Sequence, residues 1–244
     1  MILIGIDDTD TLDTPGTNQL ARRIAATLPS GYHATIILRH QLLFDPRIPY
    51  TSQNGSASIG VEADRTADPA ALVAALRREL RASYVPGSDP GLCIAQALEQ
   101  LPAEVLAFGR RCQREPVRQA DAREIARRAG VLLEGFGGTE DGVIGALAAV
   151  GLSASGDDGR VVHRAGWSWP DGFTGAQPVP AIRARGVDEV RDARSGAVLA
   201  DGTVDIGKHL RPSFRRGRVV LFVERSAPSW SAPPTAEWRA LKLL

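Results

Sequence analysis

The sequence contains few cysteines and no long apolar run. Only two cysteines occur in 244 residues, Cys93 and Cys112, and neither belongs to a CxxC pair. This spacing argues against a zinc site and gives no sign of a disulfide framework. The longest apolar stretch, residues 143–152, is rich in glycine and alanine and too short to cross a bilayer. We therefore expect neither a disulfide-stapled fold nor a membrane protein.

The chain also lacks a strong charge bias and a secretory signal. Its formal net charge of +1 argues neither for nor against a nucleic-acid partner. The first residues are apolar, with no basic segment and no cleavage site, so we expect a cytoplasmic protein. Apolar residues make up 43% of the chain, which suffices for a real core. The length allows one large domain, or one domain with a smaller appendage.

Hydrophobic patterns predict an α/β protein, with a mixed α+β sheet and helices over residues 1–160 and a smaller, mostly β portion over 161–244. Strands are expected at residues 2–6, 35–40 and 56–61. Helices are expected at 18–28, after Asp68-Pro69, at 119–130 with Gly130 at its end, and at 143–152. Residues 93–102 indicate a weak strand or a helix start, and residues 187–224 indicate hairpins before a Pro-rich tail.

Three aspartates fall within four residues at the end of the first expected strand, in the segment GIDDTD of residues 5–10. Successive side chains alternate along a strand, but the turn that follows can gather two of the three carboxylates. Clustered carboxylates stay ionised at low cost only beside a cation, and Mg²⁺ is commonly shared between one or two carboxylates and a phosphate. The alternative is a solvated turn that Asp8 or Asp10 caps with its side chain.

A glycine-rich loop, GFGGTEDG at 135–142, runs into the apolar helix VIGALAAVGL. Flexible glycines before a helix start can present N–H groups and a positive helix end to phosphate. The segment is neither a P-loop nor a Rossmann fingerprint, since both spacings are absent. The alternative is a tight contact between helix and sheet that requires Gly142 and Gly145 for packing.

A second loop, FDPRIPYTSQNG at 44–55, is stiffened by two prolines. Arg47 offers a two-pronged fork for phosphate, and Asn54-Gly55 permits a turn with positive φ. The alternative is a simple rigid connection between strands.

Together these segments resemble the TiaS family, the archaeal enzymes that make agmatidine on isoleucine tRNA. That family carries a GIDDTD start, a loop N-P-x-I-P-Y followed by a turn containing N-G, and a helix G-L-I-G-A-L-A-A-V-G. The counterparts here are GIDDTD at 5–10, DPRIPY at 45–50 with NG at 54–55, and GVIGALAAVGL at 142–152; SDPG at 88–91 is similar to a further N-P-G segment. The resemblance covers roughly residues 1–155, which correspond to the ATP-using kinase domain of the family.

The resemblance implies a domain that uses ATP and magnesium to phosphorylate a tRNA cytosine, after which an amine, agmatine, displaces the phosphate. Asp7, Asp8 and Asp10 would hold the metal and the triphosphate, and Thr17 falls on the family threonine that is autophosphorylated. The further residues expected to contact the nucleotide or substrate are Gly137, Gly138, Thr139, Gly142, Gly145, Arg47 and Asn54.

The chain also departs from the family. It lacks the cysteines of the family's zinc ribbon, shows no convincing OB-fold, and has Thr51, Ser52 and Gln53 where the family has basic residues. We therefore expect a Mg-ATP-dependent phosphotransferase or ligase that acts through a phosphorylated intermediate, with tRNA, an amine or another small molecule as substrate. The alternative is a non-catalytic nucleotide- or RNA-binding module with the same fold.

The remaining polar and aromatic residues leave alternatives open. His33, His40, His163 and His209 lack ligand spacing, which favours structural or surface roles. Arg211, Arg215, Arg216 and Arg218 surround Phe214 and would serve either as a solvated face or as a phosphate-binding surface. Trp167, Trp169 and Phe173 would form the core of the small portion or a platform for a base or an amine.

Overall fold

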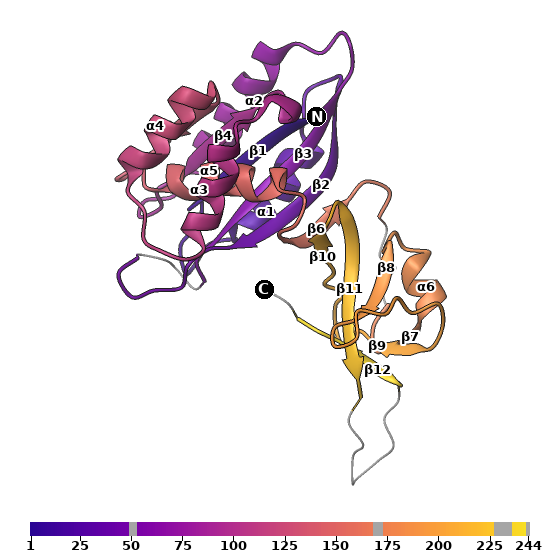
Figure 1. Cartoon of the computed structure of the whole chain (residues 1–244). Helices are drawn as coiled ribbons and strands as arrows, with labels where there is room; N and C mark the ends of the chain where they lie inside the picture. Colours follow the sequence, from indigo (N-terminus) through magenta and orange to yellow (C-terminus); the bar gives the residue numbers. More distant parts are fainter. Residues whose placement is uncertain (49–52, 168–172, 227–235, 243–244) are drawn as a thin grey trace. The chain divides into compact units, whose positions relative to one another are not determined.

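The computed structural model describes residues 1–48, 53–167, 173–226 and 236–242 (Figure 1). The chain forms two compact units, residues 1–155 and 156–244. The mixed α/β class expected from the sequence is confirmed, and so is the mostly β character of the C-terminal portion. Each unit is described by itself.

The first unit is built on an antiparallel sheet with strand order β5-β4-β1-β3-β2. Its strands are β1 (Ile2–Asp7), β2 (Tyr32–Gln41), β3 (Gly55–Ala63), β4 (Gly91–Ala95) and β5 (Leu132–Gly135). The central strand β1 is apolar because it is covered on both faces; Leu3, Ile4 and Ile6 are each at most 1% exposed. Its C-terminal end carries the first aspartate, Asp7.

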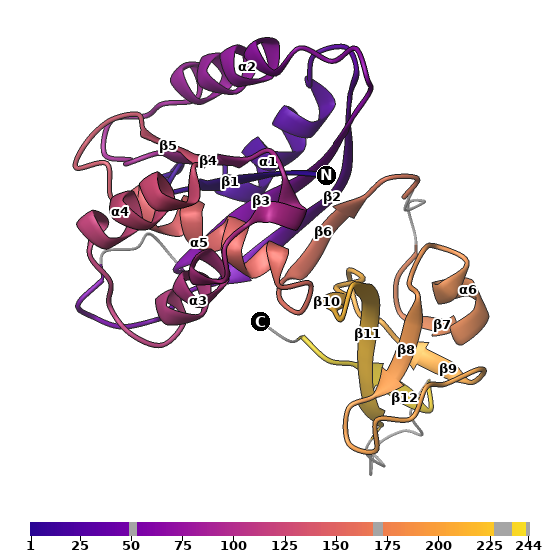
Figure 2. The ribbon, with the colours of Figure 1, turned by 45° about the horizontal axis from the view of Figure 1, so that its top comes forward.

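Helices cover both faces of this sheet. They are α1 (Thr17–Ala26), α2 (Pro69–Ala82), a short 3₁₀ turn (Leu98–Gln100), α3 (Ala103–Cys112), α4 (Gln119–Ala129) and α5 (Gly142–Ala154). In Figure 2, α2 lies on one side of the sheet and α3, α4 and α5 lie on the other. Arg23 of α1 bonds Ser83, just past the end of α2, which places α1 beside α2.

Local signals set several helix ends as expected. Asp68 accepts a hydrogen bond from the backbone N–H of Ala70 (2.9 Å), so it caps α2 ahead of Pro69. Gly130 ends α4 in the left-handed conformation, with φ +65°. Residues 93–102 contain the end of β4 and the 3₁₀ turn. Helix α3 and strand β5 were not expected from the sequence.

Helix α5 is buried along almost its whole length and packs against β1, β3 and β4. Glycines permit this contact. A Cβ on Gly5 of β1 would lie 2.0 Å from the carbonyl oxygen of Ala146, and a Cβ on Gly142 would lie 2.1 Å from that of Asp89. The close contact between helix and sheet, the alternative given for the glycine-rich segment, is therefore present. This contact brings the N-terminus of α5 to the end of β1.

Over its described residues, the second unit is a small β structure with one short helix. Its elements are β6 (Arg160–Arg164), β7 (Ala176–Pro178), α6 (Val179–Arg183), β8 (Glu189–Asp192), β9 (Thr203–Asp205), β10 (Ser213–Arg215), β11 (Arg218–Arg225) and β12 (Trp238–Ala240). Strand β11 pairs antiparallel with β10 and β12 and parallel with β8. Residues Arg216 and Gly217 form the turn of the β10–β11 hairpin, which confirms a hairpin within the arginine-rich segment.

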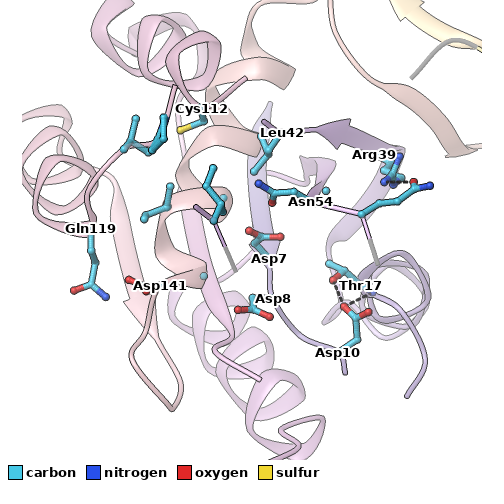
Figure 3. A pocket seen from close by; sticks show the side chains of 18 of the residues that line it. Asp7, Asp8, Asp10, Thr17, Arg39, Leu42, Asn54, Cys112, Gln119 and Asp141 are labelled. Atoms are coloured by element: carbon cyan, nitrogen blue, oxygen red, sulfur yellow. Dashed lines mark hydrogen bonds between the residues drawn. The ribbon is translucent and has the colours of Figure 1, made fainter. Parts of the chain in front are cut away.

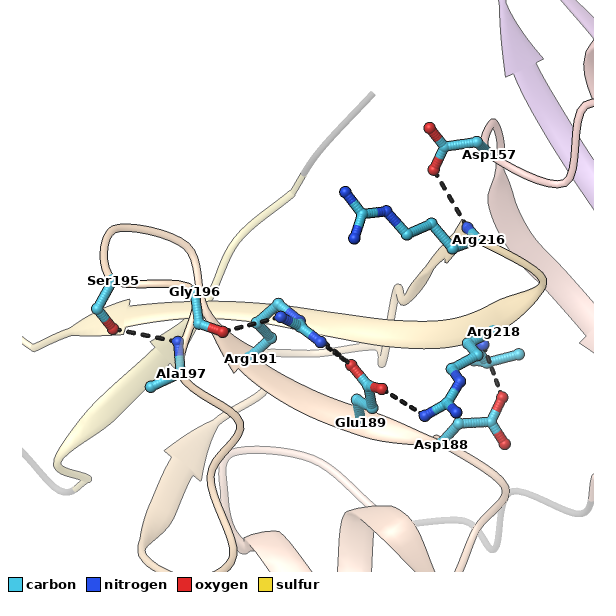
Figure 4. Close-up of polar contacts among 10 residues, drawn as sticks. Asp157, Asp188, Glu189, Arg191, Ser195, Gly196, Ala197, Arg216 and Arg218 are labelled. Carbon is cyan, nitrogen blue, oxygen red and sulfur yellow. Dashed lines mark hydrogen bonds and ion pairs between the residues drawn. The ribbon is translucent and has the colours of Figure 1, made fainter.

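Arginines of this unit mostly hold its strands together. Glu189 bonds both Arg191 and Arg218, and Arg191 also donates to the carbonyl of Gly196 (2.8 Å) (Figure 4). The backbone N–H of Arg216 donates to Asp157 (3.1 Å), which fixes the hairpin turn. These contacts favour a structural role for the Arg218 side chain and for the hairpin backbone at Arg216.

Other features left open by the sequence are also located. His33 is exposed beside Asp64 (3.3 Å), whereas His40 is buried and lies 2.8 Å from the Ser58 hydroxyl. Phe173 packs under the guanidinium of Arg185 (3.8 Å to the ring centre). Thr51, Ser52, Trp169 and most of the Pro-rich tail lie outside the described residues. Among the helices that are described, none has the length and apolar character needed to cross a membrane.

We predict that Gly5→Ala destabilises the protein by about 3 kcal/mol, because the added methyl group must push helix α5 away from β1. Urea unfolding measures the loss. Gly16→Ala is the matched control, since its φ is −63° and the nearest atom to an added Cβ is 3.7 Å away. An equal loss in both variants would show that the close contact of α5 with β1 is unimportant for stability.

Candidate functional site

A pocket of about 570 Å³ opens in the first unit at one edge of the sheet (Figure 3). Strands β1 and β2 end at this edge and β3 begins there. The pocket is lined by Asp7, Asp8, Asp10, Thr17, Arg47, Asn54, Gly142 and Gly145 among the residues expected from the sequence. The N-terminal residues of both α1 and α5 border it. Segments more than a hundred residues apart in the chain therefore meet here.

Asp7 is the last residue of β1 and faces helix α5 closely. A Cβ on Gly145 would lie 1.7 Å from the Asp7 carboxylate oxygen Oδ2, so only glycine leaves room for this side chain. Burial, with a smaller contribution from the negative charge of Asp8, raises the pKa of Asp7 to about 8. In the described part of the chain no lysine or arginine forms an ion pair with it. The carboxylate thus lies in the pocket wall without a neutralising charge.

Asp8 occupies an unusual backbone conformation, with φ +50°. Aspartate tolerates this left-handed region better than most residues, and such strain is concentrated at functional sites. Burial and then the charges of Asp89, Asp10 and Asp141 raise the pKa of Asp8 to about 6. The turn therefore gathers Asp7 and Asp8 and places them near two carboxylates from other segments.

Asp10 points instead toward the start of helix α1. Its Oδ1 atom accepts hydrogen bonds from the Thr17 hydroxyl (2.8 Å) and from the Thr17 backbone N–H (3.3 Å). Thr17 is 6% exposed and its hydroxyl also accepts a bond from Thr9 (3.2 Å). The capping alternative for Asp10 is therefore present in the structure, and the same contact orients the Thr17 hydroxyl.

The donor set limits what kind of metal site is available. Among the described residues, no three side chains of histidine, cysteine, aspartate or glutamate converge closely enough to hold a metal ion by themselves. Asp7 and Asp8 offer hard oxygen atoms, and among the described residues no lysine or arginine forms an ion pair with either of them. Two such carboxylates fit Mg²⁺ when phosphate oxygens complete its coordination.

Arg39 of strand β2 and Arg47 of the loop that follows it both line the pocket, but they have different partners. Arg47 is exposed and directs its fork at Asp45, through Nε (2.8 Å) and Nη2 (2.7 Å). This pair lowers the pKa of Asp45 to about 2. Arg39, which the sequence did not suggest, is 9% exposed and also lines the pocket. Its Nη2 donates to the side-chain oxygens of Gln41 (3.1 Å) and Gln53 (3.0 Å).

Asn54 lines the pocket but uses its side-chain amide to hold the loop. Its Nδ2 donates to the carbonyl of Leu43 (2.8 Å), and the Gln41 amide donates to the carbonyl of Asn54 (2.7 Å). These bonds support the alternative that the loop is a rigid connection, and they fix the side of the pocket on which Asn54 lies.

Part of the glycine-rich loop lies outside the pocket, unlike the other expected site residues. Gly137, Gly138 and Thr139 do not line the pocket; Gly138 and Thr139 lie against Asp89, and Gly137 lies against Tyr84. Thr139 donates to the Asp89 carboxylate through its backbone N–H (2.9 Å) and its hydroxyl (2.6 Å), and a Cβ on Gly138 would lie 1.4 Å from that carboxylate. Their direct contact with a nucleotide stays a prediction.

Part of the pocket wall is apolar. It is formed by Leu42, Ile48, Cys112, Pro116, Val117 and Ile144. Burial raises the pKa of the Cys112 thiol to about 12, so this cysteine stays protonated and serves as an apolar lining residue. A flat apolar group of a ligand would fit against this wall.

The charged lining residues that the sequence did not suggest include Arg39, Glu115, Arg118 and Asp141, and Asp89 acts on Asp8 from outside the lining. Asp141 stands directly before Gly142 at the start of α5, a position that aspartate often takes, although its side chain makes no capping hydrogen bond. Asp89 lies in the SDPG segment, for which the sequence predicts no role. Arg39 has no local signal, because its partner Gln53 lies in another segment.

The fold is similar to those of solved tRNA-modifying enzymes. A structure of apo TiaS, the tRNAIle2 agmatidine synthetase, matches 81% of this chain and 48% of its own at 20% identity, with a TM-score of 0.55. TiaS in complex with tRNA(Ile2), AMPCPP and agmatine matches 74% of this chain and 42% of its own at 21% identity, with the same TM-score. A tRNA fluorescent labeling enzyme matches 62% and 35% at 24% identity, with a TM-score of 0.53.

These likenesses define the fold class: the chain has the TiaS-like α/β fold. It spans less than half the length of each of these structures. No family model matches the chain, and no curated protein sequence matches it.

The raised pKa of Asp7 predicts a pH-dependent loss of stability in metal-free protein. The unfolded chain releases this proton near pH 3.8, the ordinary pKa of an aspartate, whereas the folded protein keeps it to about pH 8. Stability therefore falls as pH rises through this window, by at most about 1.4 kcal/mol per pH unit. Partial access of water to the side chain reduces this, so we expect a loss of roughly 2 kcal/mol between pH 5 and 8.

Urea unfolding in the presence of a chelator, at both pH values, measures this loss. Asp7→Asn should remove most of it, while Asp13→Asn, an exposed change in the same loop, should leave it intact. A pH slope that Asp7→Asn does not alter would show that Asp7 is ionised in the folded protein without a cation.

Proposed function

We propose that this chain binds Mg-ATP in the pocket and transfers a phosphoryl group, as a phosphotransferase or ligase of tRNA modification. The observation that carries the proposal is the pair Asp7 and Asp8. They lie at the end of β1 with raised pKa values and no basic partner in the described part of the chain. Carboxylates in this situation favour a cation, and a phosphate ligand would supply the rest of its coordination.

The form of the pocket supports a nucleotide as ligand. A volume of about 570 Å³ is in the range of small-molecule sites. The apolar wall suits a base, and the N-termini of α1 and α5 present positive helix ends to phosphate groups. Bound Mg²⁺ would neutralise charge on the phosphate oxygens, and Asp7 and Asp8 would hold it.

Asp10 and Thr17 supply the candidate chemistry. The Thr17 hydroxyl donates to Asp10, so Asp10 is placed to take the proton when the Thr17 oxygen attacks the terminal phosphorus of ATP. A bond from that oxygen to phosphorus would form, the bond to the β-phosphate would break, and ADP would leave. The phosphoryl group would then pass to the acceptor.

The neighbours in fold guide the choice of acceptor. The solved TiaS structures include complexes with tRNA(Ile2) and ATP, and with AMPCPP and agmatine. We propose a tRNA nucleotide as acceptor and an amine as the group that displaces phosphate. Because this chain spans less than half of those structures, another small-molecule acceptor stays in the proposal.

A second candidate function is nucleotide or RNA binding without turnover. The observation that favours it is the cap formed by Asp10 on α1, because this contact gives both Asp10 and Thr17 a structural role. The two candidates differ in whether phosphate leaves ATP.

We predict that Asp8→Asn weakens Mg-ATP binding roughly 10- to 100-fold, since a charged contact to the bound cation is lost. Asparagine tolerates the positive φ of this position, so the backbone should persist. Calorimetric titration with ATP, with and without Mg²⁺, measures the effect, and Asp13→Asn is the control. Undiminished Mg-ATP affinity in Asp8→Asn would place any metal elsewhere.

We predict that wild-type protein incubated with Mg-ATP becomes phosphorylated on Thr17, that Thr17→Ser retains the reaction, and that Thr17→Val loses it. Serine keeps the hydroxyl that Asp10 orients, whereas valine keeps only the shape. Intact-mass and peptide mass spectrometry detect the added phosphate. Tight ATP binding without phosphate on Thr17 and without ADP formation, with any RNA or amine added, would favour the non-catalytic alternative.

A further inference from the structure

Arg39 brings a positive charge into the pocket, and none of the described carboxylates pairs with it. It pairs with Ala57 of β3, which in turn pairs with Ile6 of β1, so these side chains share one face of the sheet. Asp7 follows Ile6 and therefore faces the other side. Arg39 and the carboxylate of Asp7 thus reach the pocket from opposite faces of the sheet edge, and Figure 3 shows Arg39 far from Asp141.

The hydrogen bonds of Arg39 leave most of its donors available. A guanidinium group has five N–H donors. Nη2 bonds the neutral side-chain oxygens of Gln41 and Gln53, and within the described residues nothing accepts from Nε or Nη1. Burial lowers the pKa of Arg39, yet an arginine stays charged in proteins. Two side-chain amides therefore hold the guanidinium, and no carboxylate of the described residues balances its charge.

The surroundings are shaped to keep this guanidinium in place. A Cβ on Gly55 would lie 2.7 Å from Nη2, so a glycine at this position leaves room for the group. The Gln41 amide is itself anchored on the carbonyls of Leu42 (3.0 Å) and Asn54 (2.7 Å). Arg39 is thus pre-oriented, whereas Arg47 is exposed and engaged by Asp45.

We propose that Arg39 is the anion-binding residue of the pocket and holds a phosphate group of the ligand through Nε and Nη1. The inference rests on the proposed function only in taking the ligand to be phosphorylated. The planar fork matches two phosphate oxygens, and an anion here would balance a charge that is costly to bury alone. The phosphate belongs either to a nucleotide or to the backbone of an RNA acceptor, and the experiment separates these two sources.

The test measures binding by calorimetry to Mg-ATP, adenosine, metal-free tripolyphosphate and a single-stranded RNA oligonucleotide. Arg39→Met keeps the length of the side chain and removes charge and donors; Arg39→Lys keeps the charge alone. Arg65→Met is the matched control, because Arg65 is exposed on the first unit outside the pocket. We expect Arg39→Met to weaken at least one phosphate probe tenfold or more, Arg39→Lys to recover part of this, and adenosine binding to stay unchanged.

Each outcome either supports or refutes phosphate binding by Arg39. Loss of Mg-ATP and tripolyphosphate binding places a nucleotide phosphate on Arg39, and loss of RNA binding alone places the acceptor backbone there. If Arg39→Met changes no phosphate probe more than Arg65→Met does, Arg39 only holds Gln41 and Gln53 and the inference is wrong. Wild-type binding of tripolyphosphate that depends on Arg39, with no Mg-ATP binding, would overturn the proposed function but keep the inference. Wild-type binding of none of the phosphate probes overturns both.

A stability measurement separates binding from structure. Because the guanidinium has no acidic partner, its replacement by methionine should leave the urea midpoint of the free protein close to that of wild type. A large drop in the midpoint together with uniformly weaker binding of every ligand, adenosine included, would indicate a collapsed pocket and a purely structural arginine.

Discussion

Helix α5 packs so closely on β1 and β4 that only glycine fits at the points of contact, and the position of the pocket depends on this constraint. A methyl group at Gly5 or Gly142 would overlap backbone atoms of the facing element. The contact brings the start of α5 to the end of β1, and Gly145 leaves room for the Asp7 carboxylate. Packing requirements alone thus place the poorly solvated carboxyl group of Asp7 beside the N-terminus of α5. Its ionised form is favoured there only when a cation binds beside it.

The pocket therefore has two electrostatic ends. One end is acidic, with Asp7 and Asp8 joined by the charges of Asp89 and Asp141. The other end is basic, with the buried guanidinium of Arg39 held by neutral amides. A ligand that satisfies both must present anionic oxygens to the arginine and share a cation with the acids. A polyphosphate with bound magnesium meets this description, whereas a simple cation meets half of it and a neutral metabolite meets neither half.

Signals that act over a few residues were readable in the sequence, and signals that depend on distant partners were not. The cap at Asp68, the end of α4 at Gly130 and the strand before GIDDTD follow from local chemistry and are present in the structure. Helix α3 and the four-residue strand β5 are stabilised mainly by packing on α5 and β4, which no local pattern shows. Arg39 reads as an ordinary strand residue until Gln53 and Gly55 are placed beside it.

The two strongest motifs carry different kinds of information. In GVIGALAAVGL the glycines are needed for packing: Gly142 contacts the backbone of β4, and Gly151 contacts that of Val105. A match there reports how α5 fits the sheet and would hold for a protein with this fold and any ligand. In GIDDTD the strained Asp8 and the poorly solvated Asp7 contribute nothing that packing requires, and in metal-free protein they lower stability near neutral pH. Because Asp7 and Asp8 lower the stability of the metal-free protein, ligand binding is the better explanation for their presence. The aspartates therefore indicate function, whereas the glycines of α5 indicate the fold.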